Sequence, residues 1–463
     1  MKKISGKLLF CILTLSLIWI GFAGAADHSF IEGPLNSGPE ATKACLECHE
    51  DAAKDMMKTS HWSWNMEQVI DGKPIKRGKI SAMNNFCVSV RSNEPRCTSC
   101  HVGYGWKDSS FDFTDESKVD CLVCHDTTGT YVKTSTGAGL PADDVDLLYV
   151  ARNVGKSSRQ NCGSCHFFGG GGDAVKHGDL DSSMDYPSKE IDVHMDTDGN
   201  DFSCASCHET TNHDIPGNAM VVSPKGEKHI GCIGCHGEDV HSESVLNQHT
   251  DTVACQTCHI PAFAKEIPTK TSWDWSTAGK DIKGEKDQYG KPTYVKKKGN
   301  FTWGKNITPE YAWYNGTAGA YQFGQKIDPT KVTALSYPNG KRSEMDAKIY
   351  PFKIHTGKQI YDTKNMYFIT PKVYGGKGDK EAYWKNFNWV KAATAGMKAS
   401  GLDFSGEFDF APTIMYWRIN HMVAPKEQAL GCLECHGDNG RLDWAKLGYQ
   451  GDPLKDTKYA RTK

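Results

Sequence analysis

The sequence predicts mainly short α-helices and irregular loops packed around eight repeated attachment sites, with some short β-strands in the 265–380 region. Three observations predict this class. Sixteen of the 18 cysteines fall into eight copies of one pattern, Cys-x-x-Cys-His. The segments between the copies are rich in Gly, Asp and Ser and share no fixed period, which excludes a solenoid. Residues 265–380 instead alternate short aromatic runs with turns, which favours strands.

Each copy of the pattern is typical of c-type haem attachment, in which two thiols bond the porphyrin and the adjacent His binds the iron. Zinc, the rival ligand for paired cysteines, needs no His directly after the second Cys. A thioredoxin-like redox pair would occur once, near a βαβ pattern. The sequence therefore predicts a multihaem cytochrome c with eight covalently bound haem c groups.

The eight motifs supply sixteen attachment cysteines and eight iron-binding histidines. The cysteines are Cys45, Cys48, Cys97, Cys100, Cys121, Cys124, Cys162, Cys165, Cys204, Cys207, Cys232, Cys235, Cys255, Cys258, Cys432 and Cys435. The histidines are His49, His101, His125, His166, His208, His236, His259 and His436.

Residues 1–25 are typical of a secretory signal peptide. A short basic start precedes an apolar run over residues 8–22, and small residues follow at Ala23–Ala25. Cys11 lies in the apolar run and would be lost with the peptide. We expect an exported, periplasmic protein with no stable membrane span after cleavage. A retained anchor is the alternative, because the run is nearly long enough to cross a bilayer.

The rest of the chain is expected to form three regions. Residues 26–262 hold seven motifs and form a haem-packing body. Residues 263–425 are haem-poor and rich in aromatic side chains, and would supply distal ligands and cover the haems. Residues 426–463 carry the eighth motif and the C-terminal tail. The formal charge of -2 at pH 7 gives no sign of nucleic-acid binding.

Histidines outside the motifs are candidates for the second axial ligand of each iron. The chain has 18 histidines, of which ten stand outside the motifs. Electron-transfer haems usually carry a second His, whereas a catalytic haem needs a weak or displaceable ligand. Cys87 belongs to no motif, and an unpaired thiol is unusual in an oxidising compartment. It is either a buried inert thiol or a reactive sulfur beside a catalytic haem.

These features resemble the octahaem tetrathionate reductases of bacterial respiration. The resemblance covers nearly the whole mature chain. It includes the layout of seven motifs followed by one distant motif, and the position of Cys87 ahead of the second motif. It also rests on several segments: DAVKHGDL after the fourth motif, TSHWSW at His61, DVHM at His194, NQHTDTVACQTCHIP, PFKIHTGKQIYD and RINHMVAPKEQALGCLECHG.

The resemblance implies that the haem of the second motif is the active site. Lys176 would bind its iron, and which face Lys176 and His101 each take stays open. An iron-bound lysine must be neutral, so its pKa must lie far below the usual value of about 10.4. Cys87 would lie beside this haem, and His177 would line the pocket as a proton donor.

The other seven haems would then carry two histidines each. The expected distal ligands are His61, His194, His213, His241, His249, His355 and His421, which leaves His28, His177 and His229 over.

The expected activity is reduction of tetrathionate to two thiosulfates. The partners would be a small inorganic oxyanion substrate and an electron-donor cytochrome or quinol-linked protein. Reduction of nitrite or hydroxylamine is one alternative, although the Cys-x-x-Cys-Lys motif of dedicated octahaem nitrite reductases is absent. A non-enzymatic electron-transfer cytochrome is the other. Calcium binding at Met195–Asp201 is a weaker possibility, since the closing Glu of an EF-hand loop is missing and a solvated turn is favoured.

Overall fold

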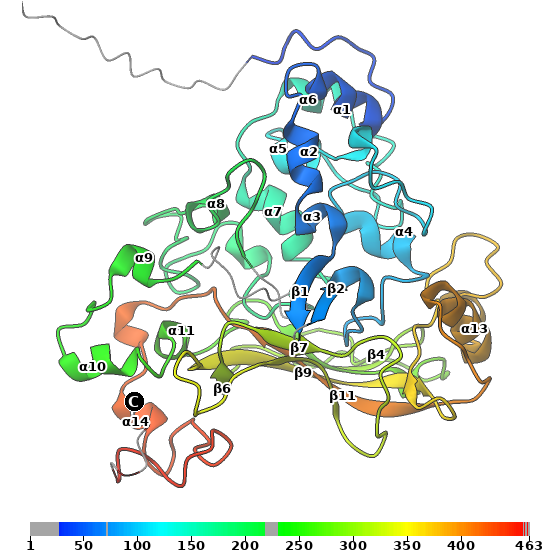
Figure 1. The fold of residues 1–463 in the computed structure, drawn as a ribbon. Coiled ribbons are helices and arrows are strands. Elements are labelled where there is room, and N and C mark those ends of the chain that lie inside the picture. The colour runs from blue at the N-terminus through cyan, green and yellow to red at the C-terminus, as the bar shows by residue number, and fades with distance from the viewer. Residues whose placement is uncertain (1–26, 71–72, 218–229, 457, 459–460, 462–463) are drawn as a thin grey trace, which may run out of the picture.

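The computed structural model describes residues 27–463 except 71–72, 218–229, 457, 459–460 and 462–463 (Figure 1). The expected signal peptide, with Cys11, and His229 lie outside the described residues. Figure 1 shows short helices and loops standing above a broad sheet, with the C-terminal segment beside one end of that sheet. Within the described ranges, no helix is long and apolar enough to cross a membrane.

The upper part is built from short helices joined by loops. Several motifs form a single helical turn, because side chains three and four residues apart share one helix face and can serve one haem together. The helices are α1 (Gly38–Leu46), α2 (Ala52–Met57), α3 (Ser60–Ser63), α4 (Glu94–Cys97), α5 (Leu122–His125), α6 (Leu147–Arg152), α7 (Arg159–His166), α8 (Cys204–Cys207), α9 (Ile233–His236), α10 (Ser244–His249) and α11 (Cys255–His259). Short 3₁₀ turns lie at Lys79–Ser81, Thr98–Cys100, Glu116–Lys118 and Ser182–Met184.

The lower part is a nine-stranded sheet in the order β4-β5-β3-β9-β11-β8-β7, with β6 and β10 also paired to β9. Its strands are β3 (Thr269–Asp274), β4 (Tyr294–Val295), β5 (Gly299–Gly304), β6 (Glu310–Tyr314), β7 (Ala318–Ala320), β8 (Thr333–Pro338), β9 (Lys348–Asp362), β10 (Tyr367–Phe368) and β11 (Phe408–Arg418). A separate hairpin of β1 (Met66–Ile70) and β2 (Lys73–Arg77) lies between the two parts.

The sheet is larger than the sequence suggested. β9 is 15 residues long and pairs with β11 in antiparallel register from Phe352 to Asp362. β11 alternates buried and partly exposed side chains from Ala411 to Trp417, the period of a strand with one face in the core. The fold is therefore mixed rather than mainly helical, and its strands run past the expected region to Arg418.

The segment 381–401 forms two helices. α12 (Tyr383–Asn386) ends where Phe387 takes a left-handed conformation, and α13 (Trp389–Ser400) starts anew. The Asn388 side chain accepts a hydrogen bond from the Lys391 amide and so caps the second helix. α13 ends at Gly401, whose φ of 70° is the left-handed conformation common at helix ends.

The C-terminal region packs against the seventh motif and the edge of the sheet. After a 3₁₀ turn at Lys426–Gln428, α14 (Cys432–Cys435) carries the eighth motif. The Leu430 amide donates to the Cys258 carbonyl at 3.0 Å, and the Trp313 indole donates to the Leu447 carbonyl at 2.8 Å. These contacts bring the distant eighth motif beside the seventh.

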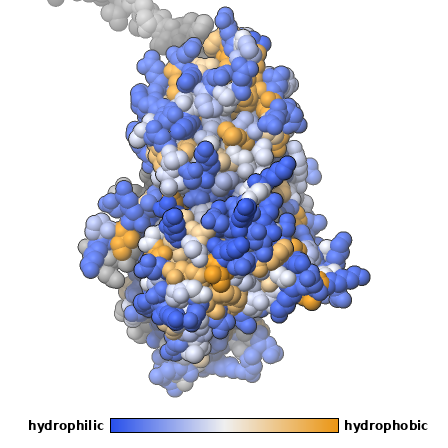
Figure 2. All heavy atoms as spheres, turned by 90° about the vertical axis from the view of Figure 1, so that its right-hand side faces the viewer, coloured by the Kyte–Doolittle hydropathy of each residue, from blue (hydrophilic) through white to orange (hydrophobic). Residues whose placement is uncertain are grey.

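A continuous cavity of about 2470 Å³ lies inside the molecule and is lined by residues of both parts, including many motif cysteines. The outer surface on one side is mostly hydrophilic, with apolar side chains only in patches between polar ones (Figure 2). Apolar surface is thus turned largely inward, toward a space that the protein chain does not fill.

Candidate haem sites and active site

Seven motif histidines each face a second histidine across about 6 Å. The ring centres are separated by 6.3 Å in His28–His49, 6.2 Å in His61–His166, 6.3 Å in His125–His213, 5.9 Å in His194–His236, 6.4 Å in His208–His421, 6.0 Å in His241–His259 and 6.3 Å in His249–His436. Each pair joins one motif histidine to one histidine outside the motifs.

These pairs fit two axial ligands of one haem iron. Half the separation is about 3 Å, which leaves about 2 Å from a central metal to a ring nitrogen, the usual metal–imidazole bond. Nδ1 of His125, His208 and His249 faces a backbone carbonyl at 2.7–2.8 Å. A carbonyl only accepts hydrogen bonds, so Nδ1 carries the proton and Nε2 keeps the lone pair that a metal needs.

Carboxylates orient two further ligands in the same way. The Asp179 carboxylate lies 3.1 Å from Nδ1 of His421, and Asp452 lies 2.5 Å from Nδ1 of His436. Asp179 also accepts the backbone amides of Asn420 and His421, so its carboxylate is fixed in the core. Its pKa falls to about 2, because the hydrogen bond and charge of His421 outweigh its burial.

His101 of the second motif differs from the other seven motif histidines. It is 1% exposed, and its Nε2 lies 2.6 Å from the Trp62 carbonyl, so the nitrogen that would bind a metal carries a proton instead. Its ring packs against Trp62, Trp64 and Trp106 at 4.8–5.5 Å. Among the pairs found in the described residues, none contains His101. His101 is thus the motif histidine that faces a backbone carbonyl rather than a second histidine.

Lys176 lies in the cavity beside the second motif. Its Nζ is 4.7 Å from the ring centre of Trp417, and it lines the same cavity as Cys97 and Cys100. Burial, reinforced by the nearby charge of Lys79, lowers the pKa of Lys176 to about 7. No carboxylate in the described part of the chain forms an ion pair with it. A neutral amine of this kind has the lone pair that an iron ligand requires.

The other expected active-site residues line the same cavity. His177 packs against Trp417 at 5.1 Å, and burial keeps its pKa well below the usual value. Burial therefore favours the neutral imidazole of His177, and its role as a proton donor stays a prediction. Burial also raises the pKa of the Cys87 thiol, partly offset by the positive charges of Lys298 and Arg96.

The distal histidines differ from expectation at one position. Six of the seven expected residues face a motif histidine, but His355 does not: it is fully buried in β9 against Phe86, 4.6 Å between ring centres. His28 takes the remaining place, opposite His49. The Arg152 side chain donates two hydrogen bonds to the Ile31 carbonyl and so fixes the segment that carries His28. Nothing in the sequence near His28 signals this anchor.

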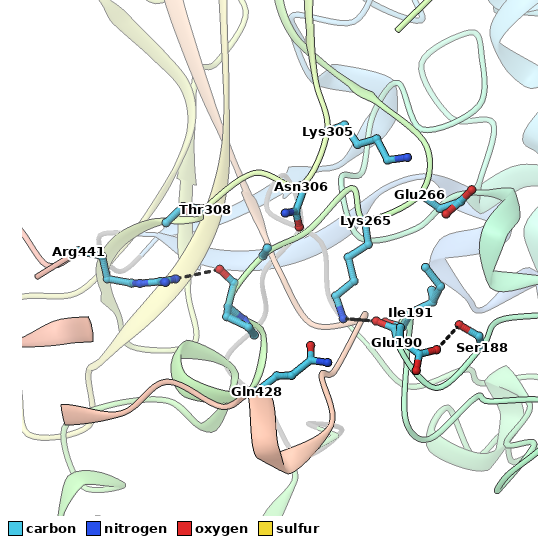
Figure 3. A pocket seen from close by; sticks show the side chains of 12 residues that line it. Ser188, Glu190, Ile191, Lys265, Glu266, Lys305, Asn306, Thr308, Gln428 and Arg441 are labelled. Carbon is cyan, nitrogen blue, oxygen red and sulfur yellow. Dashed lines mark hydrogen bonds between the residues drawn. The ribbon is translucent and has the colours of Figure 1, made fainter. Parts of the chain in front are cut away.

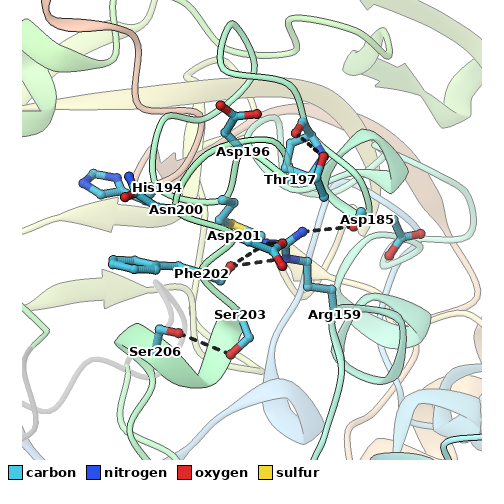
Figure 4. Close-up of polar contacts among 12 residues, drawn as sticks. Arg159, Asp185, His194, Asp196, Thr197, Asn200, Asp201, Phe202, Ser203 and Ser206 are labelled. Carbon is cyan, nitrogen blue, oxygen red and sulfur yellow. Dashed lines mark hydrogen bonds and ion pairs between the residues drawn. The ribbon is translucent and has the colours of Figure 1, made fainter.

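The segment Met195–Asp201 does not form a calcium site. The Asp201 carboxylate binds the Arg159 guanidinium at 2.8 Å, and that arginine also donates to the Phe202 and Asp185 carbonyls (Figure 4). Over the described ranges, no group of three or more His, Cys, Asp or Glu side chains could hold a metal ion. The Asp201 carboxylate is therefore engaged in an ion pair within the protein.

Neighbouring motifs lie in contact. The thiols of Cys45 and Cys121, Cys100 and Cys165, Cys162 and Cys204, and Cys232 and Cys255 interact in pairs. The first motif is thereby joined to the third, the second to the fourth, the fourth to the fifth and the sixth to the seventh. These contacts form three groups of motifs, and the second motif belongs to the group that also holds the fourth and the fifth.

Comparisons with known proteins agree with this arrangement. The model of the bacterial cytochrome c family matches residues 270–439, and that of cytochrome c554 and c-prime matches residues 44–126. An uncharacterized protein of Archaeoglobus fulgidus is 25% identical over 239 residues, covering 41% of this chain and 80% of that protein. The crystal structure of octaheme cytochrome c from Shewanella oneidensis is 59% identical, with a TM-score of 0.90, over 95% of this chain and 100% of that chain. The chain therefore belongs to the octahaem c-type cytochromes, with covalently bound haem c and an electron-transfer or redox function.

Proposed function

We propose that this protein reduces tetrathionate to two thiosulfates at the second-motif haem, with the other seven haems as its electron relay. One asymmetry carries the proposal. Seven motif histidines face a second histidine, whereas Nε2 of His101 is bonded to a backbone carbonyl and a neutral Lys176 lies in its place beside the motif. A lysine-bound iron keeps its opposite face for a substrate, as the resemblance to tetrathionate reductases implies.

Charge in this part of the cavity favours an anionic substrate. Lys79, Arg96 and Lys298 line it, and none forms an ion pair with a carboxylate of the described residues. Tetrathionate is a dianion, and two electrons split its central S–S bond into two thiosulfate dianions. Negative charge therefore doubles during the reaction, and fixed positive groups stabilise the developing charge.

Proton demand favours tetrathionate over nitrite or hydroxylamine. Splitting tetrathionate consumes two electrons and no protons, whereas both nitrogen compounds need protons to reach their reduced products. His177 is held neutral by burial, and the Cys87 thiol has a raised pKa. Burial thus makes His177 a poor proton donor, which suits a reaction that needs no protons.

We infer that Cys87, which lines the same cavity, takes part in this cleavage. Its thiolate would attack one central sulfur of tetrathionate and release the first thiosulfate. Two electrons from the haems would then break the new Cys–S bond, release the second thiosulfate and restore the thiolate. Lys298 and Arg96 favour the thiolate, which burial alone would disfavour.

Replacing Cys87 with Ser is expected to lower tetrathionate turnover by about 100-fold or more, the usual loss for one positioned catalytic group. Ser retains the shape of Cys but is a far weaker nucleophile toward sulfur. Steady-state turnover and mass spectrometry of the oxidised protein mixed with tetrathionate measure the effect. A thiosulfate adduct on Cys87 is expected in the wild type only, and an unchanged rate in the variant would remove Cys87 from the reaction.

The function itself is tested by electron paramagnetic resonance and turnover with tetrathionate, nitrite and hydroxylamine in turn. We expect one haem signal of the oxidised protein to change on adding tetrathionate, and the highest kcat/KM for this substrate. Eight low-spin signals that no substrate alters would instead support a non-enzymatic electron-transfer cytochrome. A higher kcat/KM for nitrite or hydroxylamine would support the other alternative.

The location and electron donor follow from the same proposal. Residues 1–25 would direct export to the periplasm. The donor would be a cytochrome or a quinol-linked protein, because the relay accepts electrons singly and collects two for each substrate.

A further inference from the structure

We infer that Lys353, deep in the central strand β9, is a positioning residue for Lys176; this inference rests on the proposed function. Lys353 is 0% exposed. Its Nζ donates hydrogen bonds to the carbonyls of Val175 at 3.1 Å and Lys176 at 3.0 Å. A third bond runs to Oγ1 of Thr269 at 2.5 Å. A lysine side chain has at most three donors, and each of them here has an acceptor.

Thr269 extends the same support from the neighbouring strand β3. Its hydroxyl donates to the Ala174 carbonyl at 2.5 Å. The Gly178 carbonyl accepts the backbone amide of Ala264 at 2.7 Å. Each backbone carbonyl from Ala174 to Lys176 thus accepts a hydrogen bond from a side chain of the sheet. The Gly178 carbonyl accepts one from the loop that precedes β3.

The segment needs this support because its conformation is costly. Ala174 has φ 60°, a left-handed conformation that side chains other than glycine rarely adopt. Such a residue persists where the surrounding structure determines its position. Lys353 and Thr269 supply those contacts one and two residues from Lys176, so they fix where the Lys176 side chain leaves the backbone.

The same face of β9 also holds the segment that carries Cys87. Residues 353, 355, 357 and 359 alternate along the strand and therefore share one face. His355 packs on Phe86, and the Gln359 side chain donates to the Asn84 carbonyl at 3.0 Å. At Gly357 a Cβ would lie 2.9 Å from Oδ1 of Asn85, so only glycine leaves room there. One strand face thus sets the spacing between Lys176 and Cys87.

Lys265 offers a matched control outside this site. It is a partly buried lysine whose Nζ donates to the Glu190 and Ile191 carbonyls at 2.8 and 3.0 Å (Figure 3). It lines a separate pocket of about 790 Å³, away from the second motif. Lys265→Met therefore removes the same kind of double contact to a loop backbone as Lys353→Met, but from the loop that precedes His194, which faces His236 at a different motif.

The experiment compares the oxidised holoproteins of wild type, Lys353→Met and Lys265→Met. For Lys353→Met we expect the second-motif haem to give more than one electron paramagnetic resonance form, while the seven bis-His signals stay unchanged. The kcat for tetrathionate should fall roughly 10–100-fold, the usual effect of removing a contact behind a metal ligand, with little change in KM. Thr269→Val, which keeps the shape of the side chain, should give the same spectral change in weaker form.

Unaltered second-motif signals in both Lys353→Met and Thr269→Val would overturn the inference, as would an equal change in Lys265→Met. The spectral readout needs no substrate, so it separates this inference from the proposed function. If the wild type fails to reduce tetrathionate while Lys353→Met still splits the haem signal, the positioning role stands and the proposed activity falls.

Discussion

Replacing Lys176 with Leu is expected to abolish the distinct second-motif haem and to lower tetrathionate turnover by more than about 100-fold. Leucine fills similar volume but offers no lone pair to iron. His101 cannot take over the ligand position, because its Nε2 is bonded to the Trp62 carbonyl and its ring is enclosed by tryptophans. The iron should then bind water or remain five-coordinate. The reduction potential of this haem should shift away from the reduction potentials of the relay haems.

Spectra and rates of three variants test this expectation. Lys176→Leu should change one haem signal of eight, and Lys176→His should convert the same signal to an ordinary low-spin form that is inactive. Lys372→Leu is the control, a partly buried lysine that pairs with Asp379 and Glu381 at 2.8 and 3.0 Å. Eight unaltered haem signals in Lys176→Leu would refute the assignment of Lys176 as an iron ligand. Full turnover together with an altered signal would refute the assignment of the second-motif haem as the active site.

Withholding haem is expected to prevent residues 27–262 from folding. The cavity of about 2470 Å³ is the space that the porphyrins would occupy. Without haem, the apolar side chains that line this space would face water, and the loss of that burial is large against the roughly 5–15 kcal/mol by which native domains are stable. The sheet has a hydrophobic cluster of its own around Trp273, Trp275 and Phe368, and should depend less on haem.

Limited proteolysis of protein expressed with and without the c-type haem attachment machinery measures this difference. The haem-free chain should be cut first and most rapidly within residues 27–262, and more slowly within the strands from β3 to β11. The double variant Cys432→Ala/Cys435→Ala is a matched control, because it removes one haem from the exposed helix α14, where Leu433 is 74% exposed. Its seven-haem product should fold. Native-like protease resistance of the haem-free chain would contradict the expectation.

Local chemistry accounts for what could be predicted at the sites. The motif places two thiols and an imidazole within five residues, so its function requires no knowledge of the fold. Six distal histidines could be named because the number of histidines nearly matched the number of irons. His28 and His355 were exchanged, because the choice depends on Arg152 holding one segment and on a core strand enclosing the other.

The fold was predicted less completely, for a similar reason. Alternating aromatic runs indicated strands, but pairing joins β9 to β11 across residues 363–407, and no local pattern specifies that register. Lys353 gave no signal at all, since an isolated lysine in a strand is usually solvated. Only its burial beneath the Lys176 segment reveals a role.

The sequence by itself predicted haem attachment at eight Cys-x-x-Cys-His motifs and left Cys87 outside them, and the resemblance to tetrathionate reductases singled out Lys176. The tertiary structure alone decided which nitrogen of His101 is occupied, which histidines face one another, and how β9 brings the Lys176 and Cys87 segments together. Covalent haem attachment depends on residues that are neighbours in the sequence. Axial ligation of the iron and the positioning of its ligands depend on packing between residues that are far apart in the sequence.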